Sequence, residues 1–374
     1  MGRVGGIEIW TPGYWKKSDS AKQFKEGAAA YRAAEAACTT PPWMGLLDIL
    51  KLDPESHPLR IPVVLPNVGW IGDAIIGHGF APFIRGGSIT NYDGIINARA
   101  GGKAQDIVAM KLSQTTVASQ WSCFYRSGGL PAAGAYTTYP TGAVHNRLSA
   151  GALPLANPGG SDKKYLLSLG VNHVTGINVV FLYDILVAAG NISANDGNVL
   201  TINTAALTRY AAEAAAGNMI IADTTTALGS SASGTNTVHY LESVAGADHS
   251  YVVESMITSC AAFRHPFGTA AAGSSYMVMP LAAGDVGVRQ VVSVDLGAAM
   301  GGSGVYALAI IRPLMLLPSV AGDTFVERDS TLQIDGLTEL VVGSDSQLGC
   351  LAFSVLASTT STGLQTYLLR TCSG

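Results

Sequence analysis

The sequence predicts a mainly β protein: a C-terminal β-sandwich with a jelly-roll-like arrangement, preceded by a looser β region and an N-terminal arm with one α-helix. Two observations predict this class. Short runs rich in Val, Ile, Thr and Tyr recur through the C-terminal half of the 374 residues, as in strands with one buried face. Turn-forming residues separate these runs, including the hairpin-type dipeptides Asp196-Gly197 and Asp335-Gly336.

Residues 1–40 form the predicted arm and helix. The first 18 residues mix Gly, Pro and aromatic side chains without a period, which indicates an extended segment. Ala21 to Ala37 is rich in Ala, Lys, Gln, Glu and Arg, which are strong helix formers, and Asp19 or Ser20 can cap its start. The Pro41-Pro42 pair ends the helix.

Residues 41–160 form a β-containing, loop-rich region. Short apolar runs alternate there with Gly and Pro, so no long helical period survives and we expect short strands and turns. Asp106 to Ser127 predicts two strands of mixed alternation. The region closes at Leu153–Gly160, LPLANPGG, whose composition is typical of a linker.

The sandwich is expected over residues 161–374, where separations between runs fit a sandwich with some long loops. A short helix is expected at Ala205 to Ala216, with an Ala-rich loop as the alternative. The predicted strands are Tyr165–Val171, Gly176–Leu186, Met219–Thr225, Thr235–Tyr240, Met277–Pro280, Val288–Asp295, Val305–Arg312, Glu339–Val342 and Leu348–Ala357.

The chain is unusually poor in charge. Hydrophobic residues make up 48% of it and charged residues only 13%, against about 25% charged in an ordinary soluble domain. A monomer needs a charged, patch-free surface to stay soluble. Because the most apolar run, Tyr306 to Val320, is interrupted by Arg312, Pro313 and Pro318, we expect no membrane-spanning helix. The remaining interpretation is extensive burial between protein subunits.

Other classes of site find little support. The net charge is −4 and the Lys and Arg residues are scattered singly, so contact with nucleic acid is not required. The five cysteines are far apart and odd in number, which fits free thiols in a reducing cytosol better than a disulfide framework or zinc site. The first residues lack the apolar core of a signal peptide, so we expect synthesis and assembly in the cytoplasm.

No catalytic motif stands out. The sequence contains no GxxxxGK[ST], HExxH or GxSxG pattern, and we expect no catalytic residue, cofactor or metal. The acidic residues are few and separated. Glu242 and Asp248 flank Tyr240 and His249, and we interpret this cluster as a solubilising loop between two strands rather than as a site.

Several segments resemble a group of tailed-bacteriophage particle proteins. Pro280–Arg289 (PLAAGDVGVR) with the strand up to Gly297 fits one such segment, and Leu153–Gly160 followed by Tyr165–Leu186 fits another. The resemblance covers about residues 85–315 and departs from the pattern between Gly246 and Tyr276. It implies a virion protein, and the group has no catalytic residues to transfer.

The sequence thus predicts a capsid cement, decoration or coat subunit of a bacteriophage virion. Its partners would be copies of itself, as a trimer or lattice, and other capsid proteins. A host-surface or glycan-binding head or tail fibre module is the alternative, although no fixed-period repeat supports it; an enzyme with an unrecognised site is a third. Aromatic and Arg side chains dominate interfaces, and the candidate intersubunit anchors are Trp10, Trp15, Trp43, Arg85, Arg126 and Arg289.

Overall fold

The computed structural model divides the chain into two compact units. One contains residues 1–103, 331–338 and 374, and the other contains residues 104–330 and 339–373. The residues described are 2–4, 7–9, 92–111, 117–140, 142–158, 162–173, 178–211, 217–241, 248–253, 255–269, 273–319, 325–329, 338–340, 349–357 and 365–373. The predicted helix at Ala21–Ala37 lies outside these residues.

The described parts of the first unit include a two-stranded sheet and a helix. Strands β1 (Gly2–Val4) and β2 (Ile7–Ile9) pair antiparallel, and helix α4 spans Tyr92–Ala100. Our expectation of strands and turns here was wrong for α4, because its apolar residues are too few to show a helical period. Gly102, at φ +73°, ends the helix: its N–H bonds the carbonyl of Arg99, and Lys103 N bonds that of Ala98.

The second unit is built from antiparallel sheets. The central sheet has the order β10 (Met219–Thr226), β17 (Val305–Ser319), β8 (Asn178–Ser193), β20 (Cys350–Ala357) and β4 (Trp121–Cys123), with β6 (Ala143–Val144) beside β8. The β7 sheet has the order β18 (Phe325–Asp329), β7 (Lys164–His173), β21 (Gln365–Ser373), β3 (Ala104–Lys111) and β5 (Gly129–Leu130), with β19 (Thr338–Glu339) beside β7.

Two smaller sheets complete this unit. The β11 sheet has the order β12 (Asp248–Val253), β11 (Asn236–Leu241), β16 (Gln290–Leu296) and β9 (Val199–Thr201). A three-stranded sheet contains β13 (Ser255–Met256), β14 (Phe267–Thr269) and β15 (Ser274–Ser275). The predicted mainly β class and its β-sandwich are therefore confirmed, whereas the jelly-roll arrangement stays a prediction.

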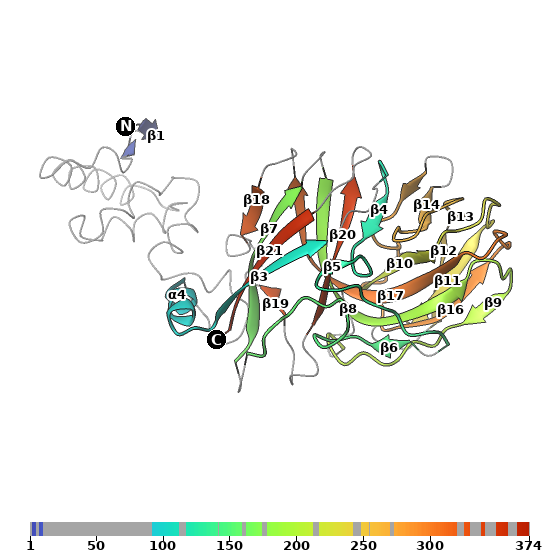
Figure 1. Cartoon of the computed structure of the whole chain (residues 1–374), viewed down its shortest axis with the longest axis horizontal. Helices are drawn as coiled ribbons and strands as arrows, with labels where there is room; N and C mark the ends of the chain where they lie inside the picture. The colour runs from blue at the N-terminus through green and yellow to red at the C-terminus, as the bar shows by residue number, and fades with distance from the viewer. Residues whose placement is uncertain are drawn as a thin grey trace, which may run out of the picture. The chain divides into compact units, whose positions relative to one another are not determined.

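The two longest strands, β8 and β17, serve two sandwiches (Figure 1). Near the start of β8, Val180 and Leu182 share a core with Leu169 of the β7 sheet. Further along, β8 contributes to a second core with residues of the β11 sheet, such as Val238. The opposite face of the central sheet forms a third core under β4 and the loops that follow it.

A β-bulge marks the transition between the two sandwiches. Ile185 pairs with Ile311 and Val187 pairs with Ile310, so Leu186 is the extra residue on β8. A bulge of this kind shifts the alternation of side chains and increases the local twist. Leu186 and Val187 consequently both reach the second core.

Two predicted elements are corrected. Residues 205–211 contain bends and no helix, because Arg209 is held by buried ion-pair contacts and Tyr210 has a φ of +51°, outside the right-handed helical region; residues 212–216 lie outside the described part. Met277–Pro280 forms a single bridge, between Met279 and Ile220, rather than a strand.

Strands on both sides of residue 160 share sheets, since β3 pairs with β21 and β4 pairs with β20.

Candidate interaction surface

Strand β3 carries apolar side chains on both of its faces. Ile107 and Ala109 point into the core between the β7 sheet and the central sheet. Val108 and Met110 point to the outer face, where they are 58% and 37% exposed. An outward-facing strand position normally carries a polar residue, so the outer face of the β7 sheet is unusual.

The strand register gathers further apolar side chains on this face. Val108 lies opposite Leu368 of β21, and Leu368 in turn lies opposite Gly170 of β7. The Phe325 ring fills the space above Gly170, where an added Cβ would lie 2.2 Å from the ring. In the next row, Met110 pairs with Leu130 of β5, which is 61% exposed. We call Phe325, Leu368, Val108, Met110 and Leu130 the apolar band.

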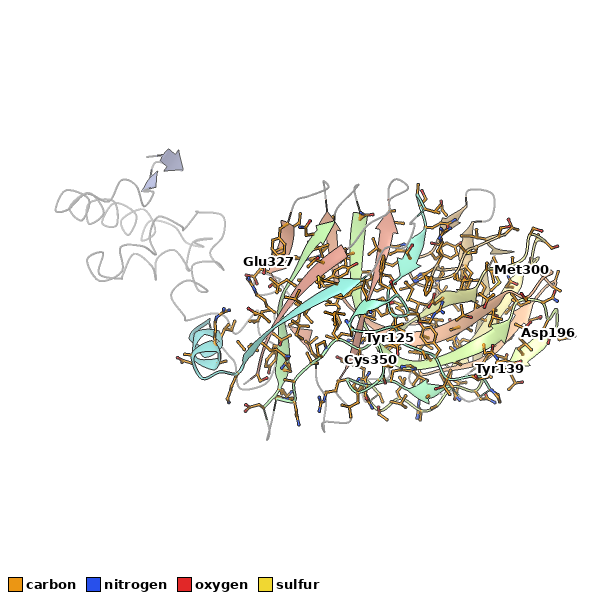
Figure 2. The ribbon with its side chains drawn as sticks, viewed as in Figure 1. Tyr125, Tyr139, Asp196, Met300, Glu327 and Cys350 are labelled. Atoms are coloured by element: carbon orange, nitrogen blue, oxygen red, sulfur yellow. The ribbon has the colours of Figure 1, made fainter. Side chains whose placement is uncertain are left out.

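A row of charged side chains borders the apolar band. Arg370 of β21 donates from Nη1 to Oε1 of Glu327 at 3.0 Å, and its Nε lies 4.0 Å from Oδ1 of Asp106. The Ser168 hydroxyl donates to the same oxygen of Glu327. The Arg370 Nε is buried and has no hydrogen-bond partner within the described residues. We call Asp106, Arg370 and Glu327 the charged row; Figure 2 labels Glu327 on β18.

Four of the six predicted anchors, Trp10, Trp15, Trp43 and Arg85, lie outside the described residues. The other two are placed away from the apolar band, and their role between subunits stays a prediction. Arg126 donates to Asp223 Oδ2 at 2.8 Å and stacks at 4.8 Å over the Phe263 ring. The Arg289 side chain is exposed.

Sequence reasoning missed Leu368 and Arg370 because it did not predict strand β21. The signal was present as a period of two: Tyr367 and Leu369 are buried, while Thr366, Leu368 and Arg370 are partly exposed. Pairing of β21 with both β3 and β7 places these side chains at the centre of the sheet.

One buried cluster has the residue types of a nucleophilic site. Ser354 Oγ lies 3.2 Å from His265 Nε2 and 3.0 Å from the Tyr183 hydroxyl. His265 Nδ1 faces the carbonyl of Tyr276 at 3.2 Å, so the ring donates there and accepts from Ser354 at Nε2. Burial lowers the pKa of His265. Ser354 has no exposed surface, so this chain of bonds joins β8 and β20 to the loop before β14 and offers no access to a substrate.

A second cluster contains Tyr240 and His249, which lie next to Glu242 and Asp248 in the sequence. The Tyr240 hydroxyl donates to Asp285 Oδ2 at 2.6 Å and accepts from Ala282 N at 2.6 Å. His249 Nδ1 lies 3.0 Å from Asp285 Oδ1. The acid in contact is therefore Asp285, from a distant loop, while Glu242 lies outside the described residues. These contacts fasten the 282–285 turn to the β11 sheet.

A third cluster is a buried ion pair at the junction of the two sandwiches. Asp184 follows Val180 and Leu182 on one face of β8, just before the bulge. Arg209 donates to both Asp184 carboxylate oxygens, at 3.0 and 2.7 Å, and neither side chain is exposed. Cys350 N donates to Oδ1 at 2.8 Å. Figure 2 labels Cys350, which lies near Tyr125 in this part of the fold.

Metal-binding groups and membrane-spanning helices were each sought among the described residues. No three His, Cys, Asp or Glu residues among those described are grouped so that they could hold a metal ion. Within the same residues, no helix has the length and apolarity needed to cross a membrane.

Comparisons with known proteins give little further information. No family model matches the chain, and no curated protein matches it significantly. Among solved structures, it is similar to the VP2 subviral particle of infectious bursal disease virus, with 10% identity, 72% of this chain and 80% of that chain covered, and a TM-score of 0.16. T=1 particles derived from the same virus give 8% identity, coverage of 72% and 77%, and a TM-score of 0.15. Similarity this low carries no argument.

Proposed function

We propose that this protein is a structural subunit of a virus particle, and specifically a cement, decoration or coat subunit of a tailed-bacteriophage capsid. The observation that carries the proposal is the apolar band, which lies on an exposed sheet face of a chain with only 13% charged residues. Solvent-exposed apolar patches on soluble proteins mark surfaces that bind other proteins. Self-association of many copies would cover such surfaces and requires no catalysed reaction.

The segments that resemble phage particle proteins support this proposal. In the fold they form β7, β8, which contributes to both sandwiches, and the 280–297 segment, which contains the Asp285 turn and strand β16. The arm at residues 1–40, with Trp10 and Trp15, would add contacts to neighbouring subunits, and assembly would take place in the host cytoplasm.

Particle size tests the proposal directly. The full chain would be purified and measured by multi-angle light scattering and negative-stain microscopy from 1 to 100 µM. We expect shells, a lattice or a discrete oligomer, or attachment to preformed capsids of the phage that encodes the protein. A chain that stays monomeric over this range and does not attach to capsids would contradict a structural role.

A further inference from the structure

The apolar band and the charged row together form one face of the β7 sheet. Arg370 lies opposite Asp106 along the inter-strand hydrogen bonds, and Glu327 reaches Arg370 diagonally from the neighbouring row. Across β18, β21 and β3 the three charges thus alternate as acid, base, acid. Beside Arg370 and Asp106 lies the row of Leu368 and Val108, and the Phe325 ring covers Gly170 in this row. A partner must therefore present an apolar row beside charges of alternating sign.

We propose that this face binds the same face of a second copy of the chain, with a two-fold axis parallel to the strands and midway between β21 and β3. The inference rests on the proposed function and names the partner of its surface. A two-fold interface brings the same patch of both subunits together, so the patch must complement itself. This axis places β21 of one copy over β3 of the other.

The charges match under this operation. Arg370 comes opposite the partner's Asp106, and Asp106 comes opposite the partner's Arg370. In the single chain, Asp106 is 45% exposed and only approaches Arg370, at 4.0 Å, while the Arg370 side chain is 38% exposed. The second copy would supply a further carboxylate to the exposed part of the guanidinium. The apolar rows match as well, because Leu368 comes opposite the partner's Val108.

The area is sufficient for a specific contact. The five strands contain 5, 10, 9, 8 and 2 residues, and a spacing of about 4.8 Å between strands with a rise of about 3.3 Å per residue gives a face on the order of 500 Å². Two such faces bury about 1,000 Å² in total, near the lower limit for a biological interface. We therefore expect a dimer of moderate affinity in solution, which further contacts in an assembly would reinforce.

The test compares two valines of equal exposure. Val108 is 58% exposed within the apolar band, and Val199 is 57% exposed on β9 of the β11 sheet. Val108→Asp and Val199→Asp are made in the full chain, their folding is checked by circular dichroism and thermal melting, and self-association is measured by sedimentation from 1 to 100 µM. We expect Val108→Asp to weaken dimerisation a hundredfold or more and Val199→Asp to leave it within twofold of wild type.

A charge swap tests the orientation. Asp106→Arg alone should weaken the dimer at least tenfold, because it sets Arg370 against a second cation, at position 106 of the partner. Asp106→Arg combined with Arg370→Asp should restore the dimer. If wild type associates but Val108→Asp leaves this unchanged, the inference is overturned while the proposed function stands. A wild type that attaches to capsids but stays monomeric in solution overturns the inference too. Failure of wild type both to assemble and to attach to capsids contradicts the proposed function itself.

Discussion

Replacing Arg209 by Met should destabilise the fold strongly, because it leaves a buried carboxylate without its cation. The Arg209 guanidinium donates two hydrogen bonds to Asp184, one to the carbonyl of His145 at 2.6 Å and one to that of Ile185 at 2.8 Å. After the substitution, the described contact that remains to Asp184 is the 2.8 Å bond from Cys350 N. Solvent cannot compensate for the lost contacts, since both side chains are fully buried.

The expected loss is about 3–5 kcal/mol in the free energy of unfolding, the range for breaking a buried ion pair by removing one partner. Its size should depend on pH. Burial raises the pKa of Asp184 and Arg209 opposes this, so without Arg209 the pKa rises further. A carboxyl whose pKa is higher in the folded state than in the unfolded state destabilises the fold as pH rises above its unfolded value. The deficit of Arg209→Met should therefore be smaller at pH 5 than at pH 8.

The assay is urea unfolding followed by circular dichroism at pH 5 and pH 8. Arg312→Met is the matched control, because Arg312 is the neighbouring arginine, stacks on Tyr210 at 5.1 Å and should cost only about 1 kcal/mol. Asp184→Asn combined with Arg209→Met removes the unpaired charge and should recover part of the loss. A cost below about 1 kcal/mol for Arg209→Met, or a cost independent of pH, would refute this reasoning.

Three further predictions follow from other features. Burial lowers the pKa of Lys111 to about 8. Between pH 8 and 10.5 the unfolded chain therefore holds this proton while the folded chain does not, and wild type should gain stability with rising pH relative to Lys111→Met. Parallel pH profiles of the two proteins in urea unfolding would contradict this. Ser354→Ala removes a hydrogen-bond partner from both His265 and Tyr183 and should cost about 1–3 kcal/mol, measured by thermal melting, whereas an unchanged melting temperature would remove its structural role. Deletion of residues 1–40 should leave a soluble fold and weaken assembly, and particles of unchanged stability in light scattering would disprove the role of the arm.

The strands that form the core were the most predictable part of the fold. β10, β16 and β20 combine β-branched or aromatic residues with nearby turn residues, so local pattern sufficed. The prediction for β8 ended at Leu186, whereas the strand continues to Ser193. The length of β17 was underestimated because Pro313 and Pro318 suggest an end, yet the strand continues to Ser319. A register shift at Pro313/Met315 accompanies the first of these prolines.

The candidate surface could not be predicted in the same way. Its members come from four strands that are far apart in the chain, and only the register of β21 between β3 and β7 places Leu368 beside Val108. Sequence separation hides such a patch, since each strand alone shows one or two outward apolar residues. The predicted anchors were chosen by residue type instead, and the described ones, Arg126 and Arg289, lie elsewhere.

The buried ion pairs sharpen the argument from charge. Arg209 with Asp184, and Arg126 with Asp223, place charged groups in the interior of a chain that has few of them. Charged residues make up 13% of the sequence, and these four contribute little or nothing to the surface because they are largely buried. A surface that is already short of charge, and that carries the apolar band, favours contact with other subunits over solubility as a monomer. The low charge content and the apolar band therefore both make the surface suited to contact between subunits, and the Val108→Asp variant tests this by placing a charge in the band.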